Sequence, residues 1–283
     1  MRANAPRCSP GSSWLCVKCK WGDDIKDPEQ KEATPANPHG PLFLGGAAEK
    51  GIVVFIHGFM GSPRQFDSLA HAVHRRGIAV ASLLLPGHGC SARDFASGSF
   101  ALWQGHVDSE IERLARDYAN IWLVGHSMGG LLAINSAISH SGHIRGIFPI
   151  ACPFRLTLIA PLSKIGLMKR FFSRSRKQVR AAYFSCCSVR TSPGLFLHVP
   201  KQAREVKKLI KAARGNLHAV RAPVAAVYSK SDELTSPKSL GILKAGLTSA
   251  GFSQLVLSDS LHAYYSEKEQ ALIEQMLLNF IGA

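Results

Sequence analysis

An apolar run followed at once by a glycine-flanked serine constrains the fold of this chain more than any other feature. The run is Ile121 to Val124, and Gly125-His126-Ser127-Met128-Gly129 follows it directly. The next stretch, Leu131 to Ser139, is rich in Ala, Leu and Ile and is typical of a buried helix. A strand that turns sharply into a helix at a serine needs small flanking residues, because other segments pass close to the strained turn. The pattern predicts a nucleophile elbow that exposes the Ser127 hydroxyl at the edge of a sheet.

Candidates for the base and the acid that such a serine needs lie near the C-terminus. Residues 222–228 are apolar throughout, and Asp232 comes shortly after them. Residues 254–258 form the next expected strand, and His262 follows it in a loop. The carboxyl ends of parallel strands meet at one edge of an open sheet, which is where such folds place their chemistry. We therefore expect Ser127, Asp232 and His262 to meet there as nucleophile, acid and base.

Other residues compete for the roles of acid and base. Glu233 is the direct neighbour of Asp232, whereas Asp259 lies three residues before His262 and suits the cap of a turn or helix. His126 cannot fold back onto its own neighbour Ser127. His57 and His88 fall in turns, where an imidazole more often serves the backbone.

A second strand and loop predict where an oxyanion would be stabilised. Residues 52–56 are apolar and mostly β-branched, and they lead into His57-Gly58-Phe59-Met60-Gly61. Backbone N–H groups beside the nucleophile and from such a loop can hold the negative oxygen of a tetrahedral intermediate. The expected donors are the N–H groups of Met128 and Phe59.

Together these motifs resemble those of serine carboxylesterases of the α/β-hydrolase superfamily, in particular small bacterial carboxylesterases and monoacylglycerol lipases. The resemblance covers about two-thirds of the chain, from about residue 45 to 153 and from 223 to the end. It is carried by His57-Gly58-Phe59-Met60-Gly61-Ser62-Pro63, Leu85-Pro86-Gly87-His88-Gly89, Gly125-His126-Ser127-Met128-Gly129-Gly130, Ser231-Asp232-Glu233 and Ser260-Leu261-His262. It implies Ser127 as nucleophile, His262 as general base and then acid, and Asp232 as its orienting partner, with no metal or organic cofactor.

Strand and helix patterns alternate along the chain, which indicates an α/β fold. We expect the α/β-hydrolase fold: a mostly parallel central sheet with helices on both faces and a helical cap insertion. With 283 residues, 46% of them hydrophobic, the chain can bury one large core. The expected strands are 52–56, 79–85, 121–124, 144–150, 222–228 and 254–258, and the expected helices are 62–76, 103–118, 131–139, 237–250 and 267–280.

Two segments depart from this alternation. Residues 1–42 are polar and without period, so we expect a disordered N-terminal extension and a hydrolase domain at 43–283. An insertion at about 155–221 is the expected cap. It contains sixteen of the 34 Lys and Arg residues but, of the 19 acidic residues, only Glu205. The cap therefore carries the whole formal net charge of +15.

One helix of the expected cap is amphipathic. Its apolar stripe consists of Ala203, Val206, Leu209, Ile210 and Ala213, and its basic face of Lys201, Arg204, Lys207, Lys208, Lys211 and Arg214. The stripe could lie over an acyl pocket while the charges are solvated. Alternatively, the basic face could attract an anionic membrane surface, where lipid esters partition. Nucleic-acid binding is disfavoured because no recognised motif accompanies the charge.

The cysteines and the apolar runs indicate in which cellular compartment the protein is expected. Seven cysteines are an odd number, and the vicinal pair Cys186-Cys187 can bridge only with strain, so we expect reduced thiols. Cys16 and Cys19 have zinc-knuckle spacing, but no second pair follows, so no metal site is expected. No run of eighteen apolar residues and no apolar secretory core are present. We expect a cytoplasmic protein that can associate peripherally with a membrane.

These observations predict a serine hydrolase that cleaves short- or medium-chain carboxylic esters or monoacylglycerols through an acyl-enzyme. Two alternatives within enzymes use the same three side chains: a lysophospholipase and an acyl thioesterase. A third alternative, from a different class, is a non-catalytic relative that only binds an acyl ligand. The intact set of Ser127, Asp232 and His262 disfavours that third alternative.

Overall fold

The computed structural model describes residues 38–156, 181, 183, 185–189, 195–248 and 250–283. Most of the expected extension at 1–42, the pair Cys16 and Cys19, and most of the first part of the expected cap lie outside this range. The boundaries predicted for those segments therefore remain predictions. No helix in the described ranges is both long and apolar enough to cross a bilayer.

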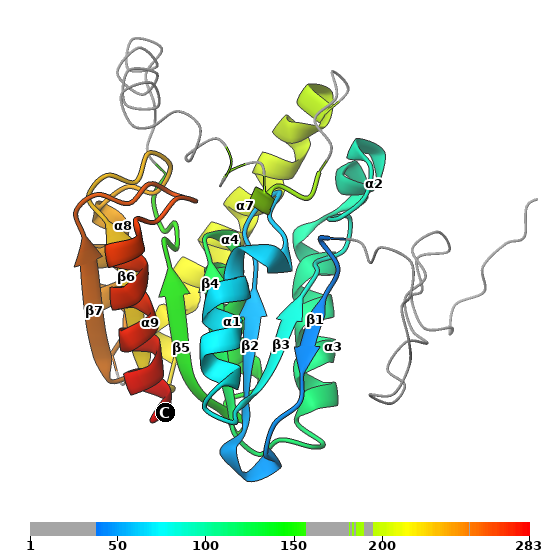
Figure 1. Ribbon diagram of the computed structural model, residues 1–283. Coiled ribbons are helices and arrows are strands. Elements are labelled where there is room, and N and C mark those ends of the chain that lie inside the picture. Colours follow the sequence, from blue (N-terminus) through cyan, green and yellow to red (C-terminus); the bar gives the residue numbers. More distant parts are fainter. Residues whose placement is uncertain (1–37, 157–180, 182, 184, 190–194, 249) are drawn as a thin grey trace, which may run out of the picture. The chain divides into compact units, whose positions relative to one another are not determined.

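A mostly parallel sheet forms the centre of the described chain (Figure 1). Its spatial order is β1-β3-β2-β4-β5-β6-β7, with β1 antiparallel to β3 and the other pairs parallel. The strands are β1 (Leu42–Leu44), β2 (Ile52–Ile56), β3 (Ala79–Leu83), β4 (Ile121–His126), β5 (Ile144–Ile150), β6 (Val224–Ser229) and β7 (Phe252–Leu257). This arrangement, with helices on both faces, confirms the predicted fold class.

Each face of the sheet is covered by its own helices. Along β2, Ile52, Val54 and Ile56 point into one hydrophobic cluster, whereas Val53 and Phe55 point into the other. This alternation follows from the two-residue period of a strand, and both faces are apolar because both are buried. Helices α3 (Phe100–Leu114), α4 (Met128–Ser139), α7 (Leu195–Asn216) and α8 (Lys238–Gly246) cover the first face, and α1 (Asp67–His74) and α9 (Glu267–Ile281) cover the second (Figure 1).

The helices differ from the predicted spans mainly at their ends. The helix expected at 62–76 is a 3₁₀ turn at Pro63–Phe66 followed by α1. Helix α3 begins three residues earlier than predicted, because the Ser99 hydroxyl accepts a hydrogen bond from the N–H of Leu102. The short helix α2 (Ala92–Ser97), capped in the same way by Ser91, was not predicted.

Helix α7, the described second half of the expected cap, packs into the main core. The side chains of Leu209 and Ala213 are fully buried against α4 in the larger hydrophobic cluster. The Glu205 carboxylate accepts a hydrogen bond of 3.1 Å from the N–H of Phe100, at the start of α3. The apolar stripe of α7 therefore holds this helix against α4, and its opposite face remains basic and exposed.

Candidate active site

Ser127 joins the central strand β4 directly to α4. Its backbone lies at φ 52° and ψ −117°, a region that costs a non-glycine residue about 1–3 kcal/mol. A Cβ on Gly129 would lie 1.9 Å from the carbonyl oxygen of Ile56, and a Cβ on Gly125 would lie 2.4 Å from that of Gly129. The close packing of β2, β4 and α4 therefore requires glycine on both sides of the serine, as the elbow motif predicts.

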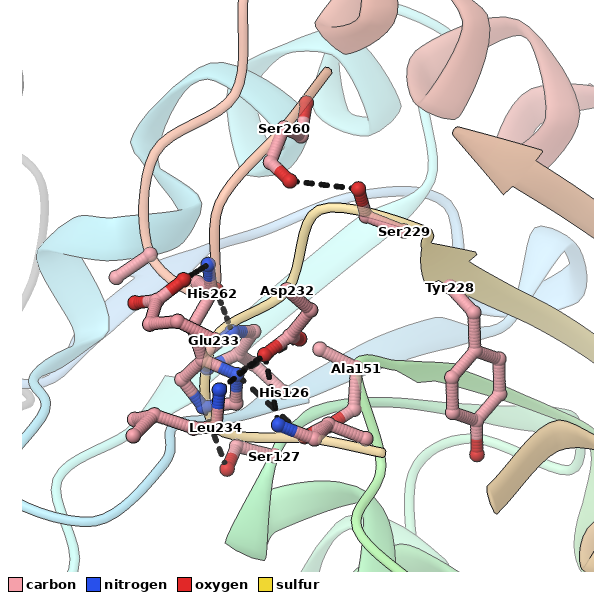
Figure 2. Close-up of polar contacts among 12 residues, drawn as sticks. His126, Ser127, Ala151, Tyr228, Ser229, Asp232, Glu233, Leu234, Ser260 and His262 are labelled. Carbon is pink, nitrogen blue, oxygen red and sulfur yellow. Dashed lines mark hydrogen bonds and ion pairs between the residues drawn. The ribbon is translucent and has the colours of Figure 1, made fainter. Parts of the chain in front are cut away.

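The structure brings Ser127, His262 and Asp232 into one chain of hydrogen bonds (Figure 2). The Ser127 Oγ lies 2.9 Å from Nε2 of His262. On the other side of the ring, Nδ1 lies 2.9 Å from Oδ2 and 3.1 Å from Oδ1 of Asp232. All three side chains are buried, and they come from loops after β4, β6 and β7, at the carboxyl edge of the sheet.

The electrostatics of this chain set the tautomer of the imidazole. Burial alone would raise the pKa of Asp232, but the hydrogen bond and charge of His262, with N–H donors from Thr235 and Leu234, hold it below its usual value. The carboxylate is thus ionised and accepts the Nδ1–H of His262. In its neutral form the ring presents an unprotonated Nε2 to the Ser127 hydroxyl, which is the arrangement needed to remove its proton.

Burial and charge oppose each other at His262. Burial lowers the pKa of the imidazole, but the hydrogen bond to Asp232 and the negative charges of Asp232 and Glu233 more than offset it. The net effect raises the pKa of His262 above its ordinary value of 6.5. An imidazole with a raised pKa accepts a proton readily from an alcohol, and the imidazolium that forms is stabilised by the adjacent carboxylates.

One predicted oxyanion donor begins the helix after the elbow, and the other lies in the loop after the neighbouring strand β2. Met128 is the first residue of α4, and Phe59 lies in the loop after β2. Within the described parts of the chain, no acceptor takes a hydrogen bond from either backbone N–H. His57 holds this loop in place, because Nδ1–H donates to the Gly58 carbonyl and Nε2 accepts from the N–H of Leu85.

Two glutamates organise the loop of His262, and sequence reasoning missed these roles. Glu233, considered only as a rival acid, accepts the main-chain N–H of His262 at 3.0 Å. Glu269 accepts the N–H groups of Ser258, Asp259 and Ser260. The spacing Ser266-x-x-Glu269 signals a capping box at the start of α9, and the Ser266 hydroxyl does accept the Glu269 N–H. The carboxylate instead binds the loop before His262, a contact that the capping pattern does not encode.

The rival residues serve other purposes in the structure. His57 and His88 bind backbone groups, as expected for histidines in turns. Asp259 is exposed. Burial is the main cause that lowers the pKa of His126 to about 3, so this ring is neutral and donates Nε2–H to the carbonyl of His262. The acid that contacts the imidazole of His262 most closely is Asp232.

Comparison with known proteins adds independent findings. A family model described as serine aminopeptidase, S33 (Hydrolase_4) matches residues 47–269. A thermostable monoacylglycerol lipase from Bacillus sp. (strain H-257) is 24% identical over 231 residues, which are 81% of this chain and 90% of that protein.

Solved structures show the same fold. A structure from a study of two metagenome-derived lipolytic enzymes, LipS and LipT, superposes with a TM-score of 0.70 at 22% identity, covering 87% of this chain and 98% of the other. The monoacylglycerol lipase of Paleococcus ferrophilus superposes with a TM-score of 0.66 at 18% identity, covering 86% and 98%.

Proposed function

The chain belongs to the serine aminopeptidase S33 family of α/β-hydrolases and is a hydrolase of the esterase and lipase type, and we propose that it cleaves carboxylic esters through an acyl-enzyme on Ser127. The proposed substrates are short- or medium-chain esters or monoacylglycerols. One observation carries the proposal: the hydrogen-bonded chain from Ser127 through His262 to Asp232. The similarity to a monoacylglycerol lipase over nine-tenths of its length supports an ester of glycerol.

The proposed reaction has two halves. The Ser127 oxygen attacks the ester carbonyl carbon while His262 Nε2 takes the hydroxyl proton, and the carbonyl oxygen becomes an oxyanion near the N–H groups of Met128 and Phe59. His262 gives that proton to the alkoxide as the carbon–oxygen bond breaks, and the alcohol leaves. Water then attacks the acyl-enzyme, with His262 again as base, which releases the acid and restores the Ser127 hydroxyl.

A panel of matched substrates tests the reaction class. We expect turnover of p-nitrophenyl and glycerol monoesters, measured over a chain-length series from two to sixteen carbons. The same acyl chains offered as lysophospholipids and acyl-CoA thioesters separate the alternatives, because all three reactions use the same side chains. A kcat/KM that is higher on a phosphate-bearing substrate would favour the lysophospholipase or the thioesterase. A protein that binds acyl chains but does not react with a fluorophosphonate would be a non-catalytic relative.

The exposed face of α7 is a candidate surface for binding to lipid membranes. Six basic side chains lie exposed along this face: Lys201, Arg204, Lys207, Lys208, Lys211 and Arg214. Because the apolar stripe of α7 is packed against α4, the helix cannot bury it in a bilayer. We propose that α7 attracts anionic membrane surfaces by charge alone, with each basic residue contributing about 1 kcal/mol near the surface.

Vesicle binding tests this second proposal. Reversing Lys207 and Lys211 to glutamate should weaken binding to phosphatidylserine-containing vesicles at low salt by at least about tenfold, and high salt should weaken the wild type similarly. The matched control reverses Lys244 and Lys268, which are exposed on α8 and α9. Equal binding to neutral and anionic vesicles would contradict the proposal. Preferential retention on RNA over anionic vesicles would identify a different partner.

A further inference from the structure

The main chain of His262 makes hydrogen bonds through both its N–H and its carbonyl group. Its N–H donates to Oε2 of Glu233 at 3.0 Å. Its carbonyl accepts Nε2–H of His126 at 2.8 Å and the hydroxyl of Tyr265 at 3.2 Å. The position of a side chain depends on the position of its backbone. These three contacts therefore limit where Nε2 of the base can lie relative to Ser127.

Glu233 is in turn held by a residue far away in the sequence. The Tyr183 hydroxyl donates to Oε1 of Glu233, and its oxygen accepts the N–H of Ala263 at 3.4 Å. Burial, together with the charge of Glu233, raises the pKa of Tyr183, so the hydroxyl stays protonated and acts as a donor. Tyr183 therefore contacts both Glu233 and the residue that follows His262.

A residue close to Tyr183 in sequence binds the loop from His57 to Gly61, which carries the expected donor Phe59 and is called the oxyanion loop here. This residue, Ser188, donates its N–H to the Met60 carbonyl at 3.0 Å and its hydroxyl to the Gly61 carbonyl at 2.6 Å. Ser188 is buried, as is its neighbour Val189, which packs with Phe95 beside the loop. Tyr183 and Ser188 are five residues apart in sequence. Tyr183 therefore contacts the loop of the base, and Ser188 contacts the loop of the expected oxyanion donor.

We propose that Glu233 and Tyr183 are positioning residues for His262, and that Tyr183 together with Ser188 holds the loop of the base and the oxyanion loop in register with each other. The inference rests on the proposed function, since it assigns His262 the role of base. Glu233 is suited to this because it combines an acceptor for the main-chain N–H with a second oxygen free for Tyr183. Glu233 thus acts through the backbone of His262 and not on the substrate.

The charge of Glu233 has a separate effect that makes the proposal measurable. The ionisable groups that face His262 are Asp232, Glu233, His126, Tyr183 and Tyr265. His126 is neutral, and the two tyrosines stay protonated because burial raises the pKa of each. Removing the Glu233 charge therefore leaves Asp232 as the only nearby anion among these groups. The pKa of His262 should then fall, so that the neutral base persists to lower pH.

The experiment measures how fast a fluorophosphonate labels Ser127 in the full chain between pH 4.5 and 9. In the plot of labelling rate against pH, the rate rises along an acid limb, as His262 loses its proton, to a plateau. Glu233→Gln keeps an acceptor for the His262 N–H but loses the charge, so the acid limb should move to lower pH while the plateau rate stays within about threefold of the wild-type rate. Glu233→Ala loses both, so the limb should move and the plateau should fall about 10- to 100-fold. Tyr183→Phe keeps the charge, so the plateau should fall about tenfold without a downward shift of the limb.

The control is Tyr228→Phe, which removes another buried hydroxyl, one that donates to the Cys152 carbonyl and lies away from the base (Figure 2). This variant should label like the wild type. The proposal is overturned if Glu233→Ala and Tyr183→Phe label at the wild-type plateau, or if Glu233→Gln leaves the limb in place. Wild-type protein that is folded yet never labelled contradicts the proposed function itself, so the two failures are distinguishable.

Discussion

Replacing Ser127 with alanine is expected to lower kcat on p-nitrophenyl esters by about 10⁴-fold or more. The variant lacks the oxygen that forms the acyl-enzyme, whereas the N–H groups of Met128 and Phe59 remain. Alanine has the same backbone strain at φ 52° as serine, so the fold should be retained. Steady-state kinetics with thermal denaturation of the same preparations checks both halves of the expectation.

The matched control removes a serine hydroxyl from the same helix. Ser139 is the last residue of α4, and its hydroxyl makes only a 3.5 Å contact with the Asn135 carbonyl among the residues described. Ser139→Ala should keep full activity.

Asp232→Asn offers a second check, since an amide favours the wrong tautomer of His262 and should lower kcat about 10³- to 10⁴-fold. Esterase activity retained in Ser127→Ala would exclude the acyl-enzyme mechanism.

Replacing Gly129 with alanine is expected to lower the free energy of unfolding by about 3–5 kcal/mol or to prevent accumulation of folded protein. The added Cβ would lie 1.9 Å from the Ile56 carbonyl oxygen and 2.7 Å from that of His57. Both obstacles are backbone atoms of β2 and its loop, so no side chain can rotate away. Relief requires α4 to move off the sheet, which would also displace Ser127. Urea denaturation measures the loss.

A glycine in open space provides the comparison. Gly105 lies within α3, is exposed, and has nothing within 4 Å of the position that a Cβ would occupy. Gly105→Ala should raise the free energy of unfolding by about 0.5–1 kcal/mol, because alanine restricts the unfolded chain and favours the helix. A Gly129→Ala protein within 1 kcal/mol of the wild type would show that the elbow has room to relax.

Local patterns predicted the parts of the fold that depend on backbone conformation and burial. The apolar run at Ile52–Ile56 is a strand with the predicted boundaries, because a strand buried on both faces must be apolar throughout. The strand Ile144–Ile150 also has the predicted boundaries, although Arg145 within it is exposed. Helix ends were predicted less well. The cap at Ser99 and the end of α8 at Gly246 depend on single hydrogen bonds and on the neighbours of each helix.

The sequence alone determined the strand, elbow and helix around Ser127, and the order of the chain that places Ser127, Asp232 and His262 after parallel strands. These features follow from glycine spacing and hydrophobic period, which act over a few residues. Only the tertiary structure decided that Glu233 binds the backbone of His262, that Glu269 binds the loop before it, and that the apolar stripe of α7 packs on α4. Such partners are set by packing between different segments of the folded chain. The sequence pattern of a carboxylate or an apolar stripe is the same whichever partner it contacts.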